Sequence, residues 1–563
     1  MAARTPAPAY EKGDLGKPPT AEADLPALDR RAFVRQLGTS AAAAALGGSA
    51  LAPAPAQASG HPGDPDSAGS RQEQAYRLRV DAARLARQRP HVAQFPNGDE
   101  DRFPNRIACY SKGLPHDGLG EVDSRAYDTL RRALRSGDPS DFERITLGLG
   151  RKLTSPQAGL SFDLEGADSH HLAIPAAPRF DGAEIAGEAA ELYWMALLRD
   201  VSFTDYETDS GILTAASDLS RYSIFEGPKS AGKVTSGTIF RGMTAGDLIG
   251  PWLSQFLLMD IPFGALRIPQ RIRTVVGHRD YLTAYADWLA AQRGFDASGT
   301  DVFESTPRYI RNLRDLAQWV HVDALYQAYL QACLILLGLG APLSPGLPPV
   351  KSVTQIGFAE FGGPHILSML TEVATRALKA VWYQKWSVHR RLRPEAYGGR
   401  VHNHMTGAAS YPLHQEILKS PVLDGVHQAH GTYLLPMVFP EGSPTHPSYG
   451  AGHATVAGAC TTMVKAFFDE SFVLPNPVVP SPDGTALVPY AGPALTAGHE
   501  LDKVAANVAI GRNAAGVHWR SDYTESLRLG EAVALTVLEE QKACYNERFQ
   551  WTLTKFDGTT VTL

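Results

Sequence analysis

Three short segments of the sequence gather cations, histidines and glycines at spacings that suit the binding of a tetrahedral oxyanion. They are residues 382–395, 446–454 and 511–522. Guanidinium and ammonium groups donate charge-assisted hydrogen bonds to the oxygens of phosphate or vanadate. The cations that could do so here are Lys385, Arg393 and Arg512.

Two histidines of these segments suit two different tasks. Gly452 and His453 begin an apolar, alanine-rich run, so we expect them at a helix N-terminus, where free backbone N–H groups and the helix dipole attract anions. His518 lies in the third segment. One imidazole can bond to the central atom of the oxyanion, and the other can move protons.

The elements that must position these side chains are mostly helices. Lys385 and Arg393 are eight residues apart on a helical pattern, so we expect them to share a face of a helix that ends at Pro394. Arg512 closes a second helical pattern, and His518 follows it six residues later, beyond Gly516.

The whole chain shows the same preference for helices. Apolar residues recur at three- and four-residue spacing in many windows, whereas sustained alternation is rare. The sequence therefore predicts a mostly α protein of packed helical bundles with few short strands, in one or two hairpins. Loops are expected at 341–349 and 474–485. The helical windows are 76–86, 183–199, 279–293, 307–338, 364–388, 452–468, 497–513 and 521–547.

Composition excludes several classes of protein. The net charge of -6 over 563 residues argues against a nucleic-acid binder. No window holds 18 consecutive strongly apolar residues, so no membrane-spanning helix is expected. The cysteines show no CxxC spacing, which argues against a zinc ribbon or a redox dithiol, and four buried thiols are expected. They are Cys109, Cys333, Cys460 and Cys544.

Residues 1–72 differ from the rest, being rich in Ala, Pro, Gly and Ser. Arg30 and Arg31 precede a weakly apolar run, and Ala56-Gln57-Ala58 is a small-x-small cleavage pattern. This arrangement resembles a twin-arginine export signal with a disordered leader, and it predicts a periplasmic or extracellular protein. The alternative is a disordered tail with a chance arginine pair.

The three chemical segments resemble those of the vanadium haloperoxidases and their relatives, the type 2 phosphatidic acid phosphatases and bacterial acid phosphatases. That superfamily carries a Lys…Arg-Pro segment, a Pro-Ser-Gly-His-like segment, and an Arg-x5-His segment with Asp four residues further on. The matching residues here are Lys385…Arg393-Pro394, Ala451-Gly452-His453 and Arg512…His518…Asp522.

Within the superfamily, the resemblance is to the bromoperoxidases of algae and cyanobacteria. Seven residues separate Lys385 from Arg393, as in the algal enzymes, whereas the phosphatases typically have six. Segments 111–116, 250–256 and 361–365 also look algal, so the resemblance runs from about residue 73 to 548. It implies a helical haloperoxidase domain at 73–563, in which the part up to about 340 is largely structural and 341–548 carries the active site.

The resemblance implies a vanadate cofactor whose vanadium is bound by His518, in a site that phosphate can also occupy. His453 matches the acid–base histidine, and His446 matches a histidine typical of bromoperoxidases. Trp382 matches an aromatic residue near the pocket, and Asp522 would orient His518. The groups expected to hold the vanadate oxygens are Lys385, Arg393, Arg512 and the backbone N–H of Gly452.

The implied reaction oxidises halide, with bromide favoured, by hydrogen peroxide to hypohalous acid, which then halogenates small organic acceptors. A homo-oligomer is also implied. One departure stands out, because the family serine that bonds vanadate is replaced by Ala451, which removes one contact to the oxyanion. Residues 338–355 contain no Asp or Glu, so they do not indicate the calcium loop of some algal relatives.

Three other interpretations remain open. In an acid phosphatase or phosphotransferase, His518 would form a phosphohistidine and His453 would protonate the leaving group; the seven-residue gap and His446 favour the peroxidase. His402-Asn403-His404 could chelate a divalent metal, but the neighbouring cations would repel it. An inactive phosphate-holding scaffold is disfavoured because every charged residue of the site is retained.

Overall fold

The computed structural model describes residues 68–563. The predicted export signal, with Arg30, Arg31 and the cleavage pattern, lies outside the described residues. Contacts divide the chain into two units, Met1–Glu73 and Gln74–Leu563. Helix α2 (Ala68–Gln88) begins in the first unit, and everything described below belongs to the second.

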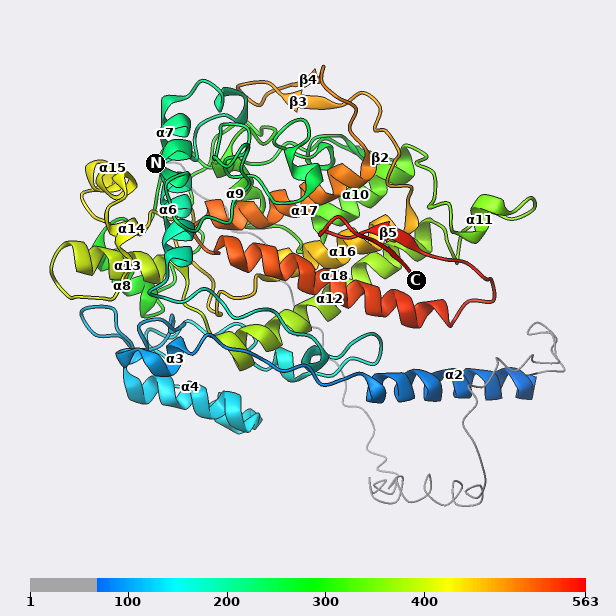
Figure 1. Ribbon diagram of the computed structural model, residues 1–563, viewed down its shortest axis with the longest axis horizontal. Helices are drawn as coiled ribbons and strands as arrows, with labels where there is room; N and C mark the ends of the chain where they lie inside the picture. The colour runs from blue at the N-terminus through cyan, green and yellow to red at the C-terminus, as the bar shows by residue number, and fades with distance from the viewer. Residues whose placement is uncertain (1–67) are drawn as a thin grey trace, which may run out of the picture. The chain divides into compact units, whose positions relative to one another are not determined.

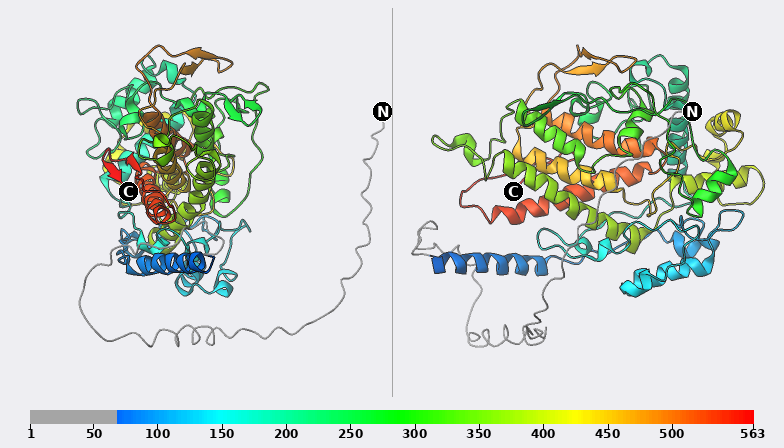
Figure 2. Two further views of the ribbon diagram at one scale, coloured as in Figure 1. Left: turned by 90° about the vertical axis from the view of Figure 1, so that its right-hand side faces the viewer. Right: turned by 180° about the vertical axis from the view of Figure 1, so that it is seen from behind.

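Four helices form the centre of the second unit: α12 (Gly363–Tyr383), α16 (Gly452–Phe467), α17 (Ala497–Ala514) and α18 (Arg520–Lys542). Helix α16 packs against each of the other three, and Figures 1 and 2 show them side by side. Their axes approach closely because glycines face backbone: a Cβ on Gly458 would lie 2.1 Å from the carbonyl oxygen of Leu527, and one on Gly530 would lie 1.9 Å from that of Thr455.

Shorter helices surround this bundle. Helix α17 also contacts α9 (Leu313–Trp319), α10 (Gln327–Gly338) and α6 (Ala183–Leu198). The π-helical turn η8 (Gln384–His389) continues α12, and α13 (Pro394–Met405) follows it. The other α-helices of residues 68–563 are α3 (Asp99–Arg102), α4 (Ser124–Ser136), α5 (Pro139–Phe142), α7 (Ser210–Leu219), α8 (Tyr285–Gln292), α11 (Pro348–Lys351), α14 (Gln415–Leu418) and α15 (Pro421–His430).

The sheet structure of residues 68–563 is limited to three antiparallel hairpins of three-residue strands. They pair β1 (Ile261–Phe263) with β2 (Leu266–Ile268), β3 (Val478–Pro480) with β4 (Leu487–Pro489), and β5 (Thr552–Thr554) with β6 (Thr560–Thr562). The prediction of a mostly helical protein with few short strands is confirmed, although there is one hairpin more than expected.

Three predicted helical windows are too long, and one of them, 521–547, extends past the end of α18 at Lys542. The window 279–293 becomes helical only at Tyr285, and the window 307–338 is interrupted between α9 and α10. The cysteines are free thiols, as expected, but Cys544 is exposed rather than buried. No helix within residues 68–563 is long and apolar enough to cross a membrane.

Candidate active site

Lys385 and Arg393 do not share one helix face, which corrects the prediction from their spacing. Arg390 takes a left-handed conformation, with φ of 41°, and ends the π-helical turn that carries Lys385. Pro394 then occupies the first turn of α13, where proline is well tolerated, so Arg393 precedes a new helix rather than closing the old one. The reversal of the chain brings the two cations together.

Arg393 is the most heavily bonded of these cations. Its Nη1 donates to the carbonyl oxygen of Val517 at 2.7 Å and lies 3.0 Å from Nε2 of His518. Its Nε donates to the carbonyl oxygen of His446 at 2.9 Å, and its Nη2 lies 2.8 Å from Nδ1 of the same histidine. Arg393 therefore ties the first chemical segment to the second and third.

The imidazole of His518 has a defined tautomer. Its Nδ1 lies 2.9 Å from Oδ2 of Asp522, which leaves Nε2 as an acceptor facing Arg393. A lone pair on Nε2 is what a metal ligand requires, and the carboxylate on the opposite nitrogen fixes the ring. Burial, then the charges of Arg393 and Lys385, hold the pKa of His518 well below its usual 6.5, so the ring stays neutral.

Asp522 is itself fixed by other groups. Its Oδ2 accepts from the backbone N–H of Trp519 at 3.0 Å and from the hydroxyl of Ser448. Its Oδ1 accepts from Arg391 at 2.9 Å, and Arg391 also pairs with Glu188 at 2.7 Å. This chain of buried charges orients His518 from behind.

Lys385, Arg393 and Arg512 form no ion pair with any carboxylate in the described part of the chain, although each is at most 6% exposed. Lys385 donates to the carbonyl oxygen of Pro447 at 3.0 Å, and Arg512 donates to that of Val320 at 2.9 Å. Burial lowers the pKa of Arg393 and of Arg512 to about 10, and lowers that of Lys385 well below 10.5. Buried charges are normally paired, so this cluster requires an anion.

The N-terminus of α16 faces the same cluster. Ala451 takes the N-cap position without a side-chain bond, and Gly452 is the first helical residue, as predicted. A Cβ on Gly452 would lie 3.0 Å from the Trp382 ring, so the glycine lets backbone and indole approach closely. The N–H of Ala451 donates to the hydroxyl of Ser526 at 2.8 Å, which ties this turn to α18.

His446 and Trp382 cover the lysine side of the cluster. Their rings lie 4.9 Å apart, and Nζ of Lys385 lies 5.2 Å from the indole centroid. Nδ1 of His446 lies 2.8 Å from Nη2 of Arg393, which can only donate, and 3.2 Å from the carbonyl oxygen of Pro447, which can only accept. Burial, then the charges of Lys385 and Arg393, hold the pKa of His446 well below its usual value, which keeps the ring neutral.

His453 is less enclosed, with its side chain 17% exposed. Its Nε2 lies 2.9 Å from Oδ1 of Asp323, so Nδ1 is left to gain or release a proton. Burial lowers the pKa of His453, the carboxylate of Asp323 raises it, and Arg512 lowers it again, with a net decrease. Such a ring accepts a proton transiently and returns it.

The predicted site residues are thus brought together from segments up to 140 positions apart. Three partners were missed. Asp323 precedes α10 in a segment with no local motif, and its contact with His453 spans 130 residues. Ser526 lies in α18, the helix that begins just after His518, and this proximity in sequence could have indicated it. Arg391 stands within the first segment but was not singled out.

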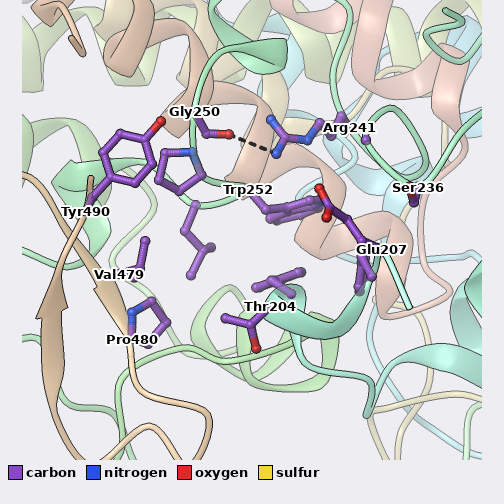
Figure 3. A pocket seen from close by; sticks show the side chains of 14 residues that line it. Thr204, Glu207, Ser236, Arg241, Gly250, Trp252, Val479, Pro480 and Tyr490 are labelled. Atoms are coloured by element: carbon purple, nitrogen blue, oxygen red, sulfur yellow. Dashed lines mark hydrogen bonds between the residues drawn. The ribbon is translucent and has the colours of Figure 1, made fainter. Parts of the chain in front are cut away.

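Two other places do not resemble this site. His402 and His404 accept hydrogen bonds from the backbone N–H groups of Tyr433 and Tyr411 rather than facing a shared ligand. A separate cavity of about 290 Å³ contains Trp252, stacked on Phe203 with ring centroids 4.1 Å apart. Figure 3 shows its arginine, Arg241, bonded to the carbonyl oxygen of Gly250. None of the predicted site residues lines this cavity.

Comparisons with known proteins agree over most of the chain. Residues 365–547 match the family described as the VCPO second helical-bundle domain. A vanadium-dependent bromoperoxidase of Corallina pilulifera is 39% identical, with 88% of this chain and 99% of the relative covered. A vanadium-dependent bromoperoxidase of Ascophyllum nodosum is 33% identical, with 89% and 94% covered.

A solved structure, the homohexameric second vanadate-dependent bromoperoxidase of Ascophyllum nodosum, has the same fold. It superposes with a TM-score of 0.84 at 30% identity, covering 88% of this chain and 91% of that one. The likeness therefore includes the segments on both sides of the candidate site.

Proposed function

The chain belongs to the vanadium-dependent bromoperoxidases, and from this membership we propose that it holds vanadate and oxidises bromide with hydrogen peroxide. The observation that carries the proposal is the cluster of Lys385, Arg393 and Arg512, three buried cations that pair with no carboxylate among residues 68–563. They lie around a histidine whose Nε2 is unprotonated. A vanadate anion has the charge, size and oxygen acceptors to satisfy all three.

The residues fit this cofactor by the chemistry of their donor atoms. His518 would bind vanadium through Nε2, and Asp522 would hold the ring from Nδ1. The three cations and the N–H of Gly452 would donate to the vanadate oxygens. When bound, vanadate supplies a Lewis-acid centre that polarises the oxygen–oxygen bond of hydrogen peroxide toward bromide.

The remaining steps belong to side chains of this protein. Bromide, hydrogen peroxide and one proton yield hypobromous acid and water, so an acid–base group must hold and deliver a proton. His453 has the geometry for this task, because Asp323 fixes Nε2 and stabilises an imidazolium. His446 lies beside Trp382 and contacts Arg393, where its ring can hold an anion or a peroxide oxygen. Hypobromous acid then brominates small organic acceptors.

The test uses the full chain with and without orthovanadate, followed by bromination of a phenolic dye with bromide and peroxide. We expect bromination only with vanadate and its loss in His518→Ala, with His427→Ala as a histidine control outside the site. A phosphatase acting through a phosphohistidine at His518 is the alternative. The relatives that match most of this chain are bromoperoxidases, so they do not favour it. Hydrolysis of a phosphate ester without bromination would reverse the proposal.

We propose that the protein is a homo-oligomer, as the Ascophyllum structural relative is a homohexamer. Large apolar side chains that remain exposed in the single chain support this: Phe162 is 79%, Leu164 101% and Ile356 92% exposed. Light scattering on the purified chain measures its mass, and a monomer at micromolar concentration would contradict the proposal.

We propose export by the twin-arginine route, on the basis of Arg30, Arg31 and the Ala56-Gln57-Ala58 pattern. Replacing both arginines by lysine should retain the protein in the cytoplasm. The N-terminal sequence of secreted protein would identify the cleavage site, and secretion of the double-lysine variant at the unmodified level would contradict the proposal.

A further inference from the structure

A second histidine–carboxylate pair lies beside the one that contains His453. Nε2 of His321 lies 2.8 Å from Oε1 of Glu441, and the two side chains are 15% and 11% exposed. His321 stands two residues before Asp323, so both pairs draw on the same short segment after α9. In each pair a carboxylate takes Nε2 and leaves Nδ1 uncommitted.

This segment is attached directly to the vanadate site. Arg512 donates to the carbonyl oxygen of Val320, the residue before His321. The His321 ring stacks on Phe439 with centroids 3.8 Å apart and planes 9° apart, and the guanidinium carbon of Arg512 lies 5.4 Å from the same Phe439 ring. The charges of both Asp323 and Glu441 act on Arg512. The two pairs therefore lie along one wall of the site.

Both pairs contain buried polar atoms that form no hydrogen bond within residues 68–563. Within residues 68–563, Nδ1 of His321, Oδ2 of Asp323 and Oε2 of Glu441 are buried and have no protein partner. Buried polar atoms of folded proteins are nearly always bonded to protein or ordered water. Bound water is the partner that would satisfy these three atoms.

Glu441 is held as a carboxylate beside His321. Burial raises the pKa of Glu441, but the hydrogen bond and charge of His321 outweigh burial and hold it below its usual value. The other charged groups that act on the pair are Lys112, which donates to the Glu441 carbonyl oxygen at 2.7 Å, and Arg151, Asp301 and Arg512.

On this basis, and resting on the proposed function, we propose that the His321–Glu441 pair belongs to a proton relay and supplies the proton that His453 loses in each turnover. Each turnover consumes one proton, as bromide and hydrogen peroxide give hypobromous acid and water. His321 passes its Nδ1 proton through water to Nδ1 of His453 and regains one from solvent, while Glu441 and Asp323 keep both Nε2 protons in place. No electrons move in this transfer.

The central variant is His321→Phe, which keeps an aromatic ring on Phe439 but cannot carry a proton. In the full vanadate-loaded chain we expect kcat to fall about tenfold or more at pH 8 and much less at pH 5, where protons are plentiful. The Kd for vanadate should stay within twofold, and added imidazole should restore part of the rate. Glu441→Gln, which keeps a hydrogen bond but no charge, should shift the rate–pH curve in the same direction.

The matched control is His427→Phe, because His427 also stacks on an aromatic ring, Tyr433, with centroids 4.5 Å apart, outside the site. It should leave the curve unchanged. The relay would be overturned if the rate–pH curve of His321→Phe superimposed on that of the unmodified chain. A drop of equal size at every pH, without rescue by imidazole, would overturn it as well. In both cases bromination by the unmodified chain would still support the proposed function. An unmodified chain that fails to brominate with vanadate would overturn both.

Discussion

Replacing Ala451 by serine should tighten vanadate binding by one to two orders of magnitude. Position 451 is the N-cap of α16, 2% exposed, and it immediately precedes Gly452, the first helical residue beside the cation cluster. A hydrogen bond to a charged group contributes about 1.5–3 kcal/mol. A change of that size lowers Kd roughly 10- to 150-fold, at about 1.4 kcal/mol for each factor of ten.

The serine hydroxyl at position 451 can also cap helix α16. The N-cap of α16 makes no side-chain hydrogen bond at present, and a serine there accepts from the N–H of the first turn. Because a hydroxyl both donates and accepts, capping and anion binding are compatible. The cap alone should raise the free energy of unfolding by about 0.5–2 kcal/mol in vanadate-free buffer.

The assay is a calorimetric titration of the vanadate-free protein with vanadate, which gives the Kd. Urea unfolding of the same protein is measured in parallel and gives the stability. Ala284→Ser is the control, since Ala284 is the uncapped N-cap of α8, away from the site, and should gain stability only. A Kd for Ala451→Ser within twofold of the unmodified value would refute the placement of residue 451 against the anion, whatever happens to stability.

Three further outcomes are expected. Asp522→Asn should weaken vanadate binding about 10- to 100-fold and destabilise the fold by about 3–5 kcal/mol, because Arg391 loses a buried partner; a lower Tm with unchanged Kd would count against the role of Asp522 behind His518. Arg512→Met should leave the vanadate-free protein within about 1 kcal/mol of its stability while weakening vanadate binding roughly 10- to 150-fold, and a large loss of stability by urea titration would argue against an unpaired cation. Burial lowers the pKa of His116 to about 4 and that of His389 to about 3, so the unfolded chain binds protons below pH 6.5 that the folded chain does not. The free energy of unfolding should therefore fall by about 5 kcal/mol between pH 6.5 and 4.5. A urea midpoint that stays constant over that range would contradict this.

Local signals were enough to predict several of the elements that carry the site. Gly452 and His453 open an apolar run, and α16 does begin at Gly452. The central helices coincide with strong helical periodicity, because a helix that packs on several neighbours needs apolar residues on a broad face. These features depend on residues close in sequence, which is why they could be predicted.

The sequence was not sufficient where tertiary contacts decide the conformation or the partner of a residue. An Arg-Pro pair is compatible with the end of one helix or the start of the next, and the left-handed Arg390 selected the second outcome. The partnership of Asp323 with His453 crosses 130 residues and has no signature in either segment. Assembly of the bundle creates such pairs, and spacing along the chain does not reveal them.

The anion site draws its donors from the ends of separate helices: η8 carries Lys385, Arg393 precedes α13, Gly452 starts α16, Arg512 closes α17 and His518 precedes α18. A bound anion would therefore act as a non-covalent cross-link between elements that otherwise repel one another. By linkage, vanadate at a thousand times its Kd would add about 4 kcal/mol to the free energy of unfolding. Bound vanadate should therefore slow proteolysis of the bundle. A substitution that opens a cavity between α16 and α18 should in turn weaken vanadate binding, because it loosens the helices that hold the anion.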